Sequence, residues 1–389
     1  MALPVQQSID LLHKLTSPFG IQASLSEEGN YRAVFTRDAV LVGLAGLIHG
    51  DEIVTEAFIR SVKNLQKTQL PQGQIASNFQ FNSREITKVS YGTLSLKTDA
   101  CTLYAIGVLS LIQEGHLIAE EWEAIITKTF QCLQTLEYND RHLIYVPQGG
   151  NWADEYPYEG YLLFDQTLRY WALKLAAKVY DNVDWQAKAA SIRQVIKLNF
   201  LQDEEEFERY HPVAYQRMNE EPIPYYLSGF SPVGYHTFFD LAANALAAIQ
   251  FPGPESKRAL EWAEQTFEKQ TAGLPPVFWP VIDSTHPQWQ SISNYFLYVF
   301  KNQPHHYHNG GIWWIWLGWL TVAYEKNGMS SAAEKIKKIT SQMISDIGLF
   351  EFDEYLNSRD FMPGGTKKMA YTATGILLMH HAEKASNIF

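Results

Sequence analysis

Acidic, aromatic and amide side chains gather in short polar segments that each stand directly before an apolar stretch. The segments read FTRDAV, SLKTDAC, NWADEYPYEG, YHTFFD, HYHNGGIWW and FDEYLNSRD. Rings that stack on sugar faces and carboxylates that bond hydroxyl groups are together typical of a carbohydrate site. We expect substrate contacts from Arg37, Asp38, Trp152, Asp154, Glu155, His308, Asn309, Trp313 and Tyr355. Taken singly, an aspartate such as Asp38 or Asp99 could simply be a helix N-cap.

Two carboxyl groups in these segments have the types needed to hydrolyse a glycosidic bond. One must protonate the leaving oxygen, and the other must activate water or attack carbon. We expect Asp99 and Glu354 to form this pair, with Asp99 as the acid, because burial at the start of an apolar helix would raise its pKa. Glu354 on a polar loop would stay ionised. The helix dipole opposes the first effect, so the division of roles stays open.

The expected pair also predicts the stereochemistry of the reaction. Asp99 and Glu354 come from distant parts of the chain, so a sugar must fit between them. Inverting enzymes hold their two carboxyls roughly 6.5 to 9.5 Å apart, whereas retaining enzymes need about 5 to 5.5 Å. We therefore expect inversion.

Three histidines, His305, His306 and His308, form a cluster before the turn NGG. Zinc enzymes place histidines at i and i+4 on a helix or combine them with cysteines, and neither pattern is present here. We therefore expect no metal and no cofactor. The spacing favours a loop in which His308 bonds a sugar hydroxyl and NGG makes a tight turn.

The tryptophan-rich segment IWWIWLGWL, which follows this turn, invites a membrane interpretation. Its apolar run from Ile312 to Ala323 is too short, because a helix needs about 20 apolar residues to span a bilayer. We expect it to be the packed wall of a buried helix, with Trp313 near its start reaching the ligand.

The elements that must position these residues are twelve helices that alternate in character. Segments such as AAEKIKKITSQMISDI are amphipathic, and their partners, such as DAVLVGLAGLI, are apolar nearly all round. This alternation predicts an all-α fold, a single (α/α)6 barrel over residues 1–389 with an inner ring inside an outer ring. The expected helices are 5–15, 36–49, 52–69, 97–113, 119–137, 160–181, 184–201, 235–248, 254–269, 310–326, 330–346 and 367–385.

The connections between the expected helices differ in length. Those that lead into apolar helices are long, notably 70–96, 202–234, 270–309 and 347–366. Long loops in a compact domain are usually functional. We therefore expect one pocket at the N-terminal ends of the inner helices.

Composition narrows the class of partner. The 389 residues carry a formal charge of -11, and lysines and arginines form no run, which argues against nucleic acid. Two cysteines and an N-terminus without the features of a secretory signal predict a cytoplasmic protein with no membrane anchor. Aromatic residues make up 14% of the chain, which favours a small sugar or oligosaccharide as ligand.

Several segments resemble the alkaline and neutral invertases, glycoside hydrolase family 100. They are YRAVFTRDAVLVGLAGLIHGDEIVTEAFIRSVKNLQ, KTDACTLYAIGVL, HYHNGGIWWIWLGWL and FDEYLNSRDFMPGGTKKMAYTATGILL. The layout is also similar to debranching-enzyme glucosidases, trehalases and processing α-glucosidases, which share the (α/α)6 barrel and an inverting mechanism. The resemblance implies an acid at Asp99, whose segment matches the family's VDS motif, and a second catalytic carboxylate at Glu354. It also implies sugar binding by Arg37, Asp38, His308 and Asn309.

The sequence departs from the invertases at three places. Leu103 and Tyr104 stand where that family has two tryptophans, and Tyr371 is the aromatic of its last motif. The segment NWADEYPYEG is closer to the W-x-D segment of debranching-type glucosidases. These differences concern the choice between sucrose and an α-glucoside.

Two alternatives lie outside the hydrolases. A sugar epimerase on the same barrel would use histidines as acid and base, and His236 and His308 could serve. A non-catalytic carbohydrate-binding barrel would keep the rings and tolerate loss of either carboxylate. Mutation of carboxylates and histidines distinguishes the three.

Overall fold

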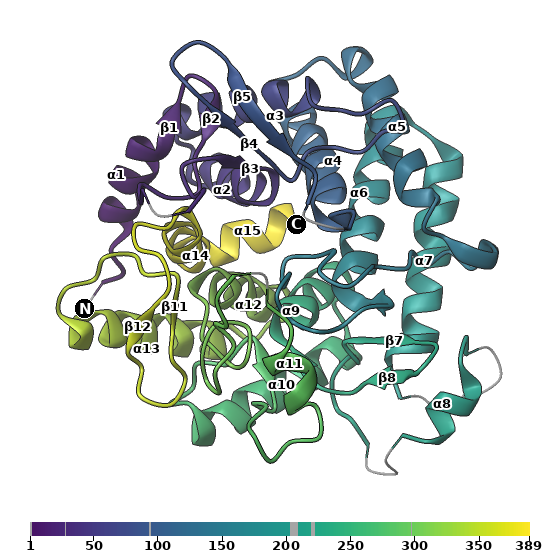
Figure 1. The fold of residues 1–389 in the computed structure, drawn as a ribbon, viewed down its shortest axis with the longest axis vertical. Helices are drawn as coiled ribbons and strands as arrows, with labels where there is room; N and C mark the ends of the chain where they lie inside the picture. Colours follow the sequence, from purple (N-terminus) through teal and green to yellow (C-terminus); the bar gives the residue numbers. More distant parts are fainter. Residues whose placement is uncertain (1, 28, 93–94, 203–208, 219–221, 297) are drawn as a thin grey trace.

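In the part of the chain that the structure describes, six apolar helices pack into a closed ring (Figure 1). The computed structural model describes residues 2–27, 29–92, 95–202, 209–218, 222–296 and 298–389. Each inner helix packs on the next, and the last packs on the first. They are α2 (Thr36–His49), α4 (Thr98–Gln113), α6 (Leu163–Tyr180), α9 (Leu241–Gln250), α12 (Trp314–Lys326) and α14 (Ala370–His380).

Six further helices surround this ring, each packed on one inner helix. They bury one face and expose the other, as the amphipathic pattern predicts. They are α1 (Val5–Leu15), α3 (Glu52–Gln66), α5 (Glu123–Gln134), α7 (Val183–Phe200), α10 (Pro254–Gln270) and α13 (Ser330–Ile347). The predicted (α/α)6 barrel is confirmed.

Small residues let the inner helices approach closely. Gly318 of α12 faces Gly375 of α14, and a Cβ added to Gly318 would lie 2.6 Å from the Gly375 carbonyl oxygen. Atoms that close clash, so neither position accepts a larger side chain without separating the helices. The glycines in these apolar segments therefore allow the ring to close.

The tryptophan-rich segment is the wall of the ring. Trp314, Trp316 and Trp319 of α12 are almost fully buried, as the sequence predicts. In the described part of the chain, none of the helices has both the length and the apolar character needed to cross a membrane.

Short elements connect the helices. The strands form two three-stranded antiparallel sheets, β3-β4-β5 and β6-β7-β8, and the antiparallel pairs β1-β2, β9-β10 and β11-β12. Their bounds are β1 (Thr16–Ser17), β2 (Gly20–Ile21), β3 (Val34–Phe35), β4 (Asn78–Phe81), β5 (Ile86–Ser90), β6 (Tyr161–Leu162), β7 (Gly229–Ser231), β8 (Gly234–His236), β9 (Phe239–Asp240), β10 (Phe278–Trp279), β11 (Tyr355–Leu356) and β12 (Pro363–Gly364). Short helices are α8 (Pro212–Gln216), α11 (Trp289–Ser293) and α15 (Ala382–Ile388), with 3-10 turns at Ala119–Glu121 and Tyr138–Asp140.

Some predicted helix boundaries are wrong. The helix expected at 235–248 begins only at Leu241, because β8 and β9 occupy the residues before it and Asp240 caps its first turn. The helix expected at 310–326 begins at Trp314, since Ile312 bridges to Leu356 instead. The segment 367–385 divides into α14 and α15. Parts of the expected loops 70–96, 202–234 and 270–309 lie outside the described residues.

Helix α15 packs against α12 and α14 at the C-terminal ends of the inner helices. In Figure 1 it lies across the middle of the ring. The ring of Phe389 lies 5.3 Å from that of Trp171 and 5.0 Å from that of Trp319. Lys326 donates to the Ser386 carbonyl, 2.6 Å away. This end of the barrel is therefore packed with side chains.

Candidate active site

A cavity of about 640 Å³ opens at the N-terminal ends of the inner helices. Its walls come from the starts of α2 and α14 and from the segments before α4, α6 and α12. The hairpin β4-β5 contributes a further side. The predicted site residues on its lining are Arg37, Asp38, Trp152, Asp154, Glu155, His308, Trp313 and Glu354.

Glu354 is held in a fixed position on the cavity wall. Its Oε2 accepts the backbone N–H of Thr366 at 3.1 Å, and its Oε1 accepts the Tyr31 hydroxyl at 3.2 Å. The Glu354 N–H in turn donates to the Thr366 carbonyl at 2.9 Å. Burial raises the pKa of Glu354, while these two donors oppose the shift. Both oxygens of this carboxyl are therefore oriented by neighbours.

Asp154 lies on the same cavity, on the segment before α6. Since α6 and α14 are three positions apart in a ring of six, Asp154 and Glu354 come from opposite sides of the barrel. Lys97 lies 3.2 Å from Asp154 Oδ2. Burial raises the pKa of Asp154, but the positive charges of Lys97 and Arg37 outweigh it, and the pKa lies below its usual range. The side chain is 36% exposed, so it is open to a ligand.

The structure places the expected acid, Asp99, away from the main cavity. It is 1% exposed, and Arg37 Nη1 donates to its Oδ2 at 2.6 Å. The Ala100 N–H donates to its other oxygen at 2.9 Å. Asp99 lines only a small adjoining hollow of about 30 Å³, whose walls include Arg37, Lys97 and Asp154 of the main cavity. Its visible role is to hold Arg37, which itself lies on the cavity wall.

Asp38 faces the cavity from the first turn of α2 and is 5% exposed. Burial raises its pKa to about 7, although Arg37 opposes this shift. A carboxyl that holds its proton near neutral pH can donate as well as accept a hydrogen bond. Asp38 is thus suited to bind a sugar hydroxyl.

Stacked rings form the aromatic wall of the cavity. The His308 ring lies 4.0 Å from Tyr307 and 5.6 Å from Trp313, nearly parallel to both. Trp152 meets His308 edge-on at 5.2 Å. Burial lowers the pKa of His308 to about 3, so the ring is neutral at pH 7. Among the described residues, His308 Nδ1 and Trp152 Nε1 have no partner. Buried polar atoms usually find one, so these two can serve a ligand.

Glu155 reaches the cavity beside Lys301, whose Nζ lies 3.3 Å from its Oε1. Burial raises the pKa of Glu155.

Two other expected contacts are not on the lining. Asn309 holds the loop, because its side chain bonds the backbone of Ile282 at 2.8 and 2.7 Å. Tyr355 lies behind Trp313, with the rings 5.9 Å apart.

The other histidines that the sequence singled out, His305, His306 and His236, bond neighbours outside the cavity. His305 bonds the Ser358 hydroxyl at 3.0 Å, and His306 bonds the Asn357 amide at 2.8 Å. His236 bonds the Glu159 carbonyl at 2.9 Å and is absent from the cavity lining. The pair His236 and His308, which an epimerase would use, is therefore not brought together.

The lining residues that sequence reasoning missed include Tyr31, Lys97, Lys301 and Tyr307. Lys97 directly precedes the helix that carries Asp99, and Tyr31 stands four residues before the polar segment that contains Arg37. Their positions before inner helices were a usable signal. Their partners, Asp154 and Glu354, lie too far along the chain for spacing to reveal them.

Among the comparisons with known proteins, the one with solved structures identifies the fold. No family model matches the chain, and no curated protein matches it. Among solved structures, it is similar to a GH63 mannosylglycerate hydrolase from Thermus thermophilus in complex with Tris and D-glycerate, at 12% identity and a TM-score of 0.66, over 96% of this chain and 99% of that one. A glycosidase variant in complex with glucose matches at 11% identity and a TM-score of 0.63, over 98% and 96%. An α-amylase from Clostridium perfringens matches at 12% identity and a TM-score of 0.55, over 96% of both chains. The chain therefore has the (α/α)6 barrel fold of these glycosidases over nearly its whole length.

Proposed function

We propose that the protein is an inverting glycoside hydrolase that acts on a short α-linked glycoside, with Asp154 and Glu354 as its catalytic pair. The observation that carries this proposal is that both carboxyls line one cavity from opposite sides of the ring. Aromatic rings and the paired polar groups around them suit a sugar. The similarity in fold to solved glycosidases supports the reaction class.

Asp154 replaces Asp99 as the proposed acid on geometric grounds. A catalytic carboxyl must reach the glycosidic oxygen. Asp99 is 1% exposed, bonded to Arg37 and absent from the cavity lining, whereas Asp154 opens into the cavity. Asp99 then acts as a positioning residue for Arg37.

The exposure of the two carboxyl groups supports an assignment of acid and base. The leaving group must depart toward the mouth, so the acid belongs on the open side, and the attacking water belongs on the deep side. Asp154 is 36% exposed and Glu354 is 5% exposed, which supports Asp154 as acid and Glu354 as base. The pKa shifts favour the opposite division, since the pKa of Asp154 lies below its usual range and that of Glu354 above it. Substrate that covers Asp154 removes its water, and this desolvation raises its pKa.

A cavity that opens at one end of the barrel, with the other end packed by α15, favours removal of one sugar from a chain end or disaccharide. Sucrose-like glycosides and α-glucosides both remain candidate substrates, and the resemblance to the alkaline and neutral invertases supports the former. A panel of sucrose, maltose, isomaltose, trehalose and nitrophenyl glycosides, assayed for released reducing sugar, identifies the substrate.

The test of the pair combines two variants with two kinds of substrate. Asp154→Asn and Glu354→Gln should each lower turnover of the natural glycoside by about three or more orders of magnitude, with circular dichroism unchanged. A glycosyl fluoride needs no proton for its leaving group. The acid variant should therefore keep substantial activity on the fluoride, and the base variant should not.

Asp99→Asn separates the two proposed acids. It should lower activity less than Asp154→Asn, and it should not regain activity on the fluoride. If Asp99→Asn instead retains fluoride hydrolysis and Asp154→Asn is near wild type, the assignment is wrong. Full activity of both Asp154→Asn and Glu354→Gln would favour an epimerase or another activity. Sugar binding without turnover in the wild type would indicate a binding protein.

A further inference from the structure

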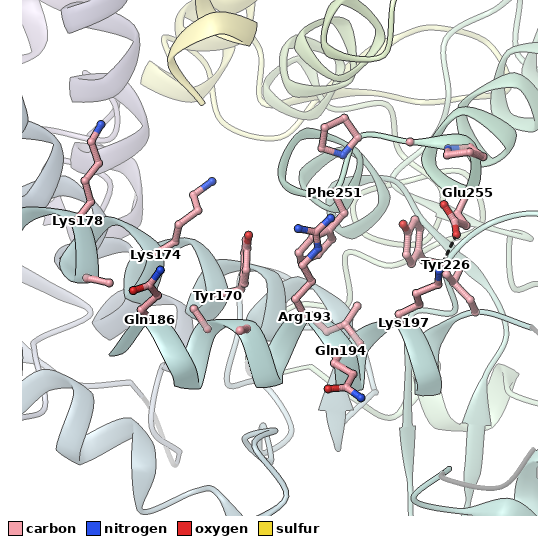
Figure 2. Close-up of a pocket in the computed structure, with 18 of the residues that line it drawn as sticks. Tyr170, Lys174, Lys178, Gln186, Arg193, Gln194, Lys197, Tyr226, Phe251 and Glu255 are labelled. Carbon is pink, nitrogen blue, oxygen red and sulfur yellow. Dashed lines mark ion pairs between the residues drawn. The ribbon is translucent and has the colours of Figure 1, made fainter. Parts of the chain in front are cut away.

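A second cavity, of about 1170 Å³, lies on the outside of the barrel (Figure 2). Helices α6 and α7 form one side, and the connection between α9 and α10 forms another. Its residues on α6 run from Tyr170, near the middle of that helix, to Lys178 near its C-terminal end. The candidate active site lies at the N-terminal end of α6, and the two cavities share no lining residue.

Cations line this outer cavity from two helices. Lys174 and Lys178 stand four residues apart, on one face of α6, and Arg193 faces them from α7. Figure 2 shows the three side chains pointing to the same side of the two helices. None has a carboxylate within 4.0 Å in the described residues. Of the two acids on the lining, Glu255 is paired with Lys197 at 3.1 Å, which leaves Asp181.

Lys174 is the most buried of these three cations. It is half-buried, donates to the Gln250 side-chain oxygen at 2.6 Å, and lies 5.5 Å from the centre of the Tyr170 ring. Burial lowers its pKa to about 8, and Lys326, Arg193 and Lys178 contribute to this lowering. The amide nitrogen of Gln250 is buried and has no partner in the part of the chain that the structure describes.

An ordinary solvent-exposed basic surface would account for exposed cations such as Lys178. It does not account for the half-buried Lys174, which has no carboxylate partner among the described residues. Like charges placed close together repel, and a half-buried ammonium without an anion costs free energy. An anion in the cavity would relieve both effects. Arginine offers a planar fork that binds phosphate at two points, and lysine adds a compact charge. Tyr170 and Phe251 supply apolar surface for an organic part.

We propose that the outer cavity is a binding site for a phosphate-bearing small molecule, held by Lys174, Lys178 and Arg193. The site is separate from the candidate active site and does not depend on the glycosidase proposal. Its volume is large enough for a small organic ligand, since such pockets measure about 300 to 1,000 Å³.

Isothermal titration calorimetry of the full chain with inorganic pyrophosphate and with glucose 6-phosphate tests the proposal. We expect saturable binding with one site per chain. Arg193→Gln and Lys174→Gln should each weaken it about tenfold, because a charge-assisted hydrogen bond is lost. Lys63→Gln, which removes the same charge from an exposed position on α3, should leave it unchanged.

Proton uptake provides a second measurement. An anion beside Lys174 raises the pKa of that lysine, so binding at pH 8 should take up a fraction of a proton. Titrations in buffers of different ionisation enthalpy measure this uptake, which Lys174→Gln should abolish.

Three binding results would overturn the proposal. One is the absence of saturable binding of either probe at millimolar concentration. Another is equal weakening by Lys63→Gln, which would indicate attraction by net charge alone. The third is loss of binding in Lys301→Gln with none in Arg193→Gln, which would place the anion in the candidate active site. Sedimentation that shows a dimer broken by Arg193→Glu would assign the cavity to a second copy of the chain and would also overturn it.

Discussion

Gly365 illustrates how one residue can control a carboxyl that it does not bond. Its φ is +76°, a conformation that favours glycine, and a Cβ there would lie 2.3 Å from Glu354 Oε2. The carboxyl of Glu354 therefore packs directly against the backbone at this position. A methyl group would push the carboxyl out of its place between Thr366 and Tyr31.

We predict that Gly365→Ala lowers kcat about 100-fold, since a displacement near 1 Å of a catalytic group can cost that much. Gly348 is the matched control because its φ is also +76° but nothing lies within 4 Å of an added Cβ. Gly348→Ala should carry the same backbone strain, seen as a lower melting temperature, with kcat unchanged. Equal kcat values for the two variants would show that Gly365 does not position Glu354.

Tyr31 is expected to affect the pH dependence of activity. Its hydroxyl donates to Glu354 and lowers the pKa of a carboxyl that burial raises. In Tyr31→Phe the pKa of Glu354 therefore rises further, so the base is protonated over a wider range of low pH. The acidic limb of the kcat/KM profile should move to higher pH, and activity on that limb should fall about fivefold, the worth of a hydrogen bond near 1 kcal/mol. An unshifted limb would contradict Glu354 as the base.

At the scale of elements, two aspartates that cap helices differ in their pKa shifts. Asp240 caps α9, where its side chain accepts the Ala243 N–H at 3.0 Å, and burial raises its pKa from 3.8 to about 7. Asp51 caps α3 and accepts the Val54 N–H at 2.9 Å. Burial also acts on Asp51, but Val54 and His13 lower its pKa. The same residue type in the same structural role therefore responds differently to pH.

We predict that Asp240→Asn stabilises the protein at high pH. The folded state keeps a proton on Asp240 that the unfolded state releases between about pH 4 and 7, so stability falls as pH rises through that window. Asparagine also caps helices but cannot ionise. The gain over wild type should be near zero at pH 4 and on the order of a few kcal/mol at pH 9, since each pKa unit is worth about 1.4 kcal/mol.

Denaturant unfolding at several pH values measures this difference. Asp51→Asn is the control with the opposite sign, because a lowered pKa contributes stability that is already complete above the unfolded value of 3.8. It should destabilise the protein by an equal amount at pH 8 and pH 9. A constant difference for Asp240→Asn as well would show that Asp240 does not hold a proton in the folded state.

The order of the helices could be predicted from the sequence because it depends on hydrophobic periodicity. Apolar and amphipathic segments alternate, and α2 through α14 follow that alternation. The short strands were not accessible. Gly229–Ser231 lies in the loop expected at 202–234, and most of Gly234–His236 and all of Phe239–Asp240 lie in the helix expected at 235–248, because two- and three-residue strands leave no period to detect.

The candidate site was accessible in part for a related reason. Five of the six segments expected at the cavity do line it, the exception being YHTFFD before α9, and the same reasoning put Asp154 and Glu354 among the candidates. It could not distinguish Asp99 from Asp154, since both precede inner helices. What distinguishes them is a side-chain contact, the hydrogen bond that Arg37 donates to Asp99. Such pairs join residues 62 positions apart and leave no local pattern.

At the scale of the whole molecule, the two ends of the barrel have different structural roles. One end holds the cavity and its charged groups, and the other is packed by α15 and Phe389. A ring of helices has an opening at each end, and an unfilled end would admit water to the apolar core. The aromatic contacts of Phe389 with Trp171 and Trp319 therefore contribute to stability rather than to the site.

This division predicts that stability and activity can be separated at the C-terminal end. Phe389→Ala should lower the free energy of unfolding by about 3 kcal/mol or more, the usual cost of removing a buried phenylalanine ring, because Phe389 is only 8% exposed. Its neighbour Ile388 is 51% exposed, so Ile388→Ala should change the free energy of unfolding by no more than about 0.5 kcal/mol. Urea unfolding gives both values, and kcat/KM of the folded variants should equal that of the wild type. A loss of activity in Phe389→Ala while it remains folded would mean that the packed end influences the cavity at the other end of the inner helices.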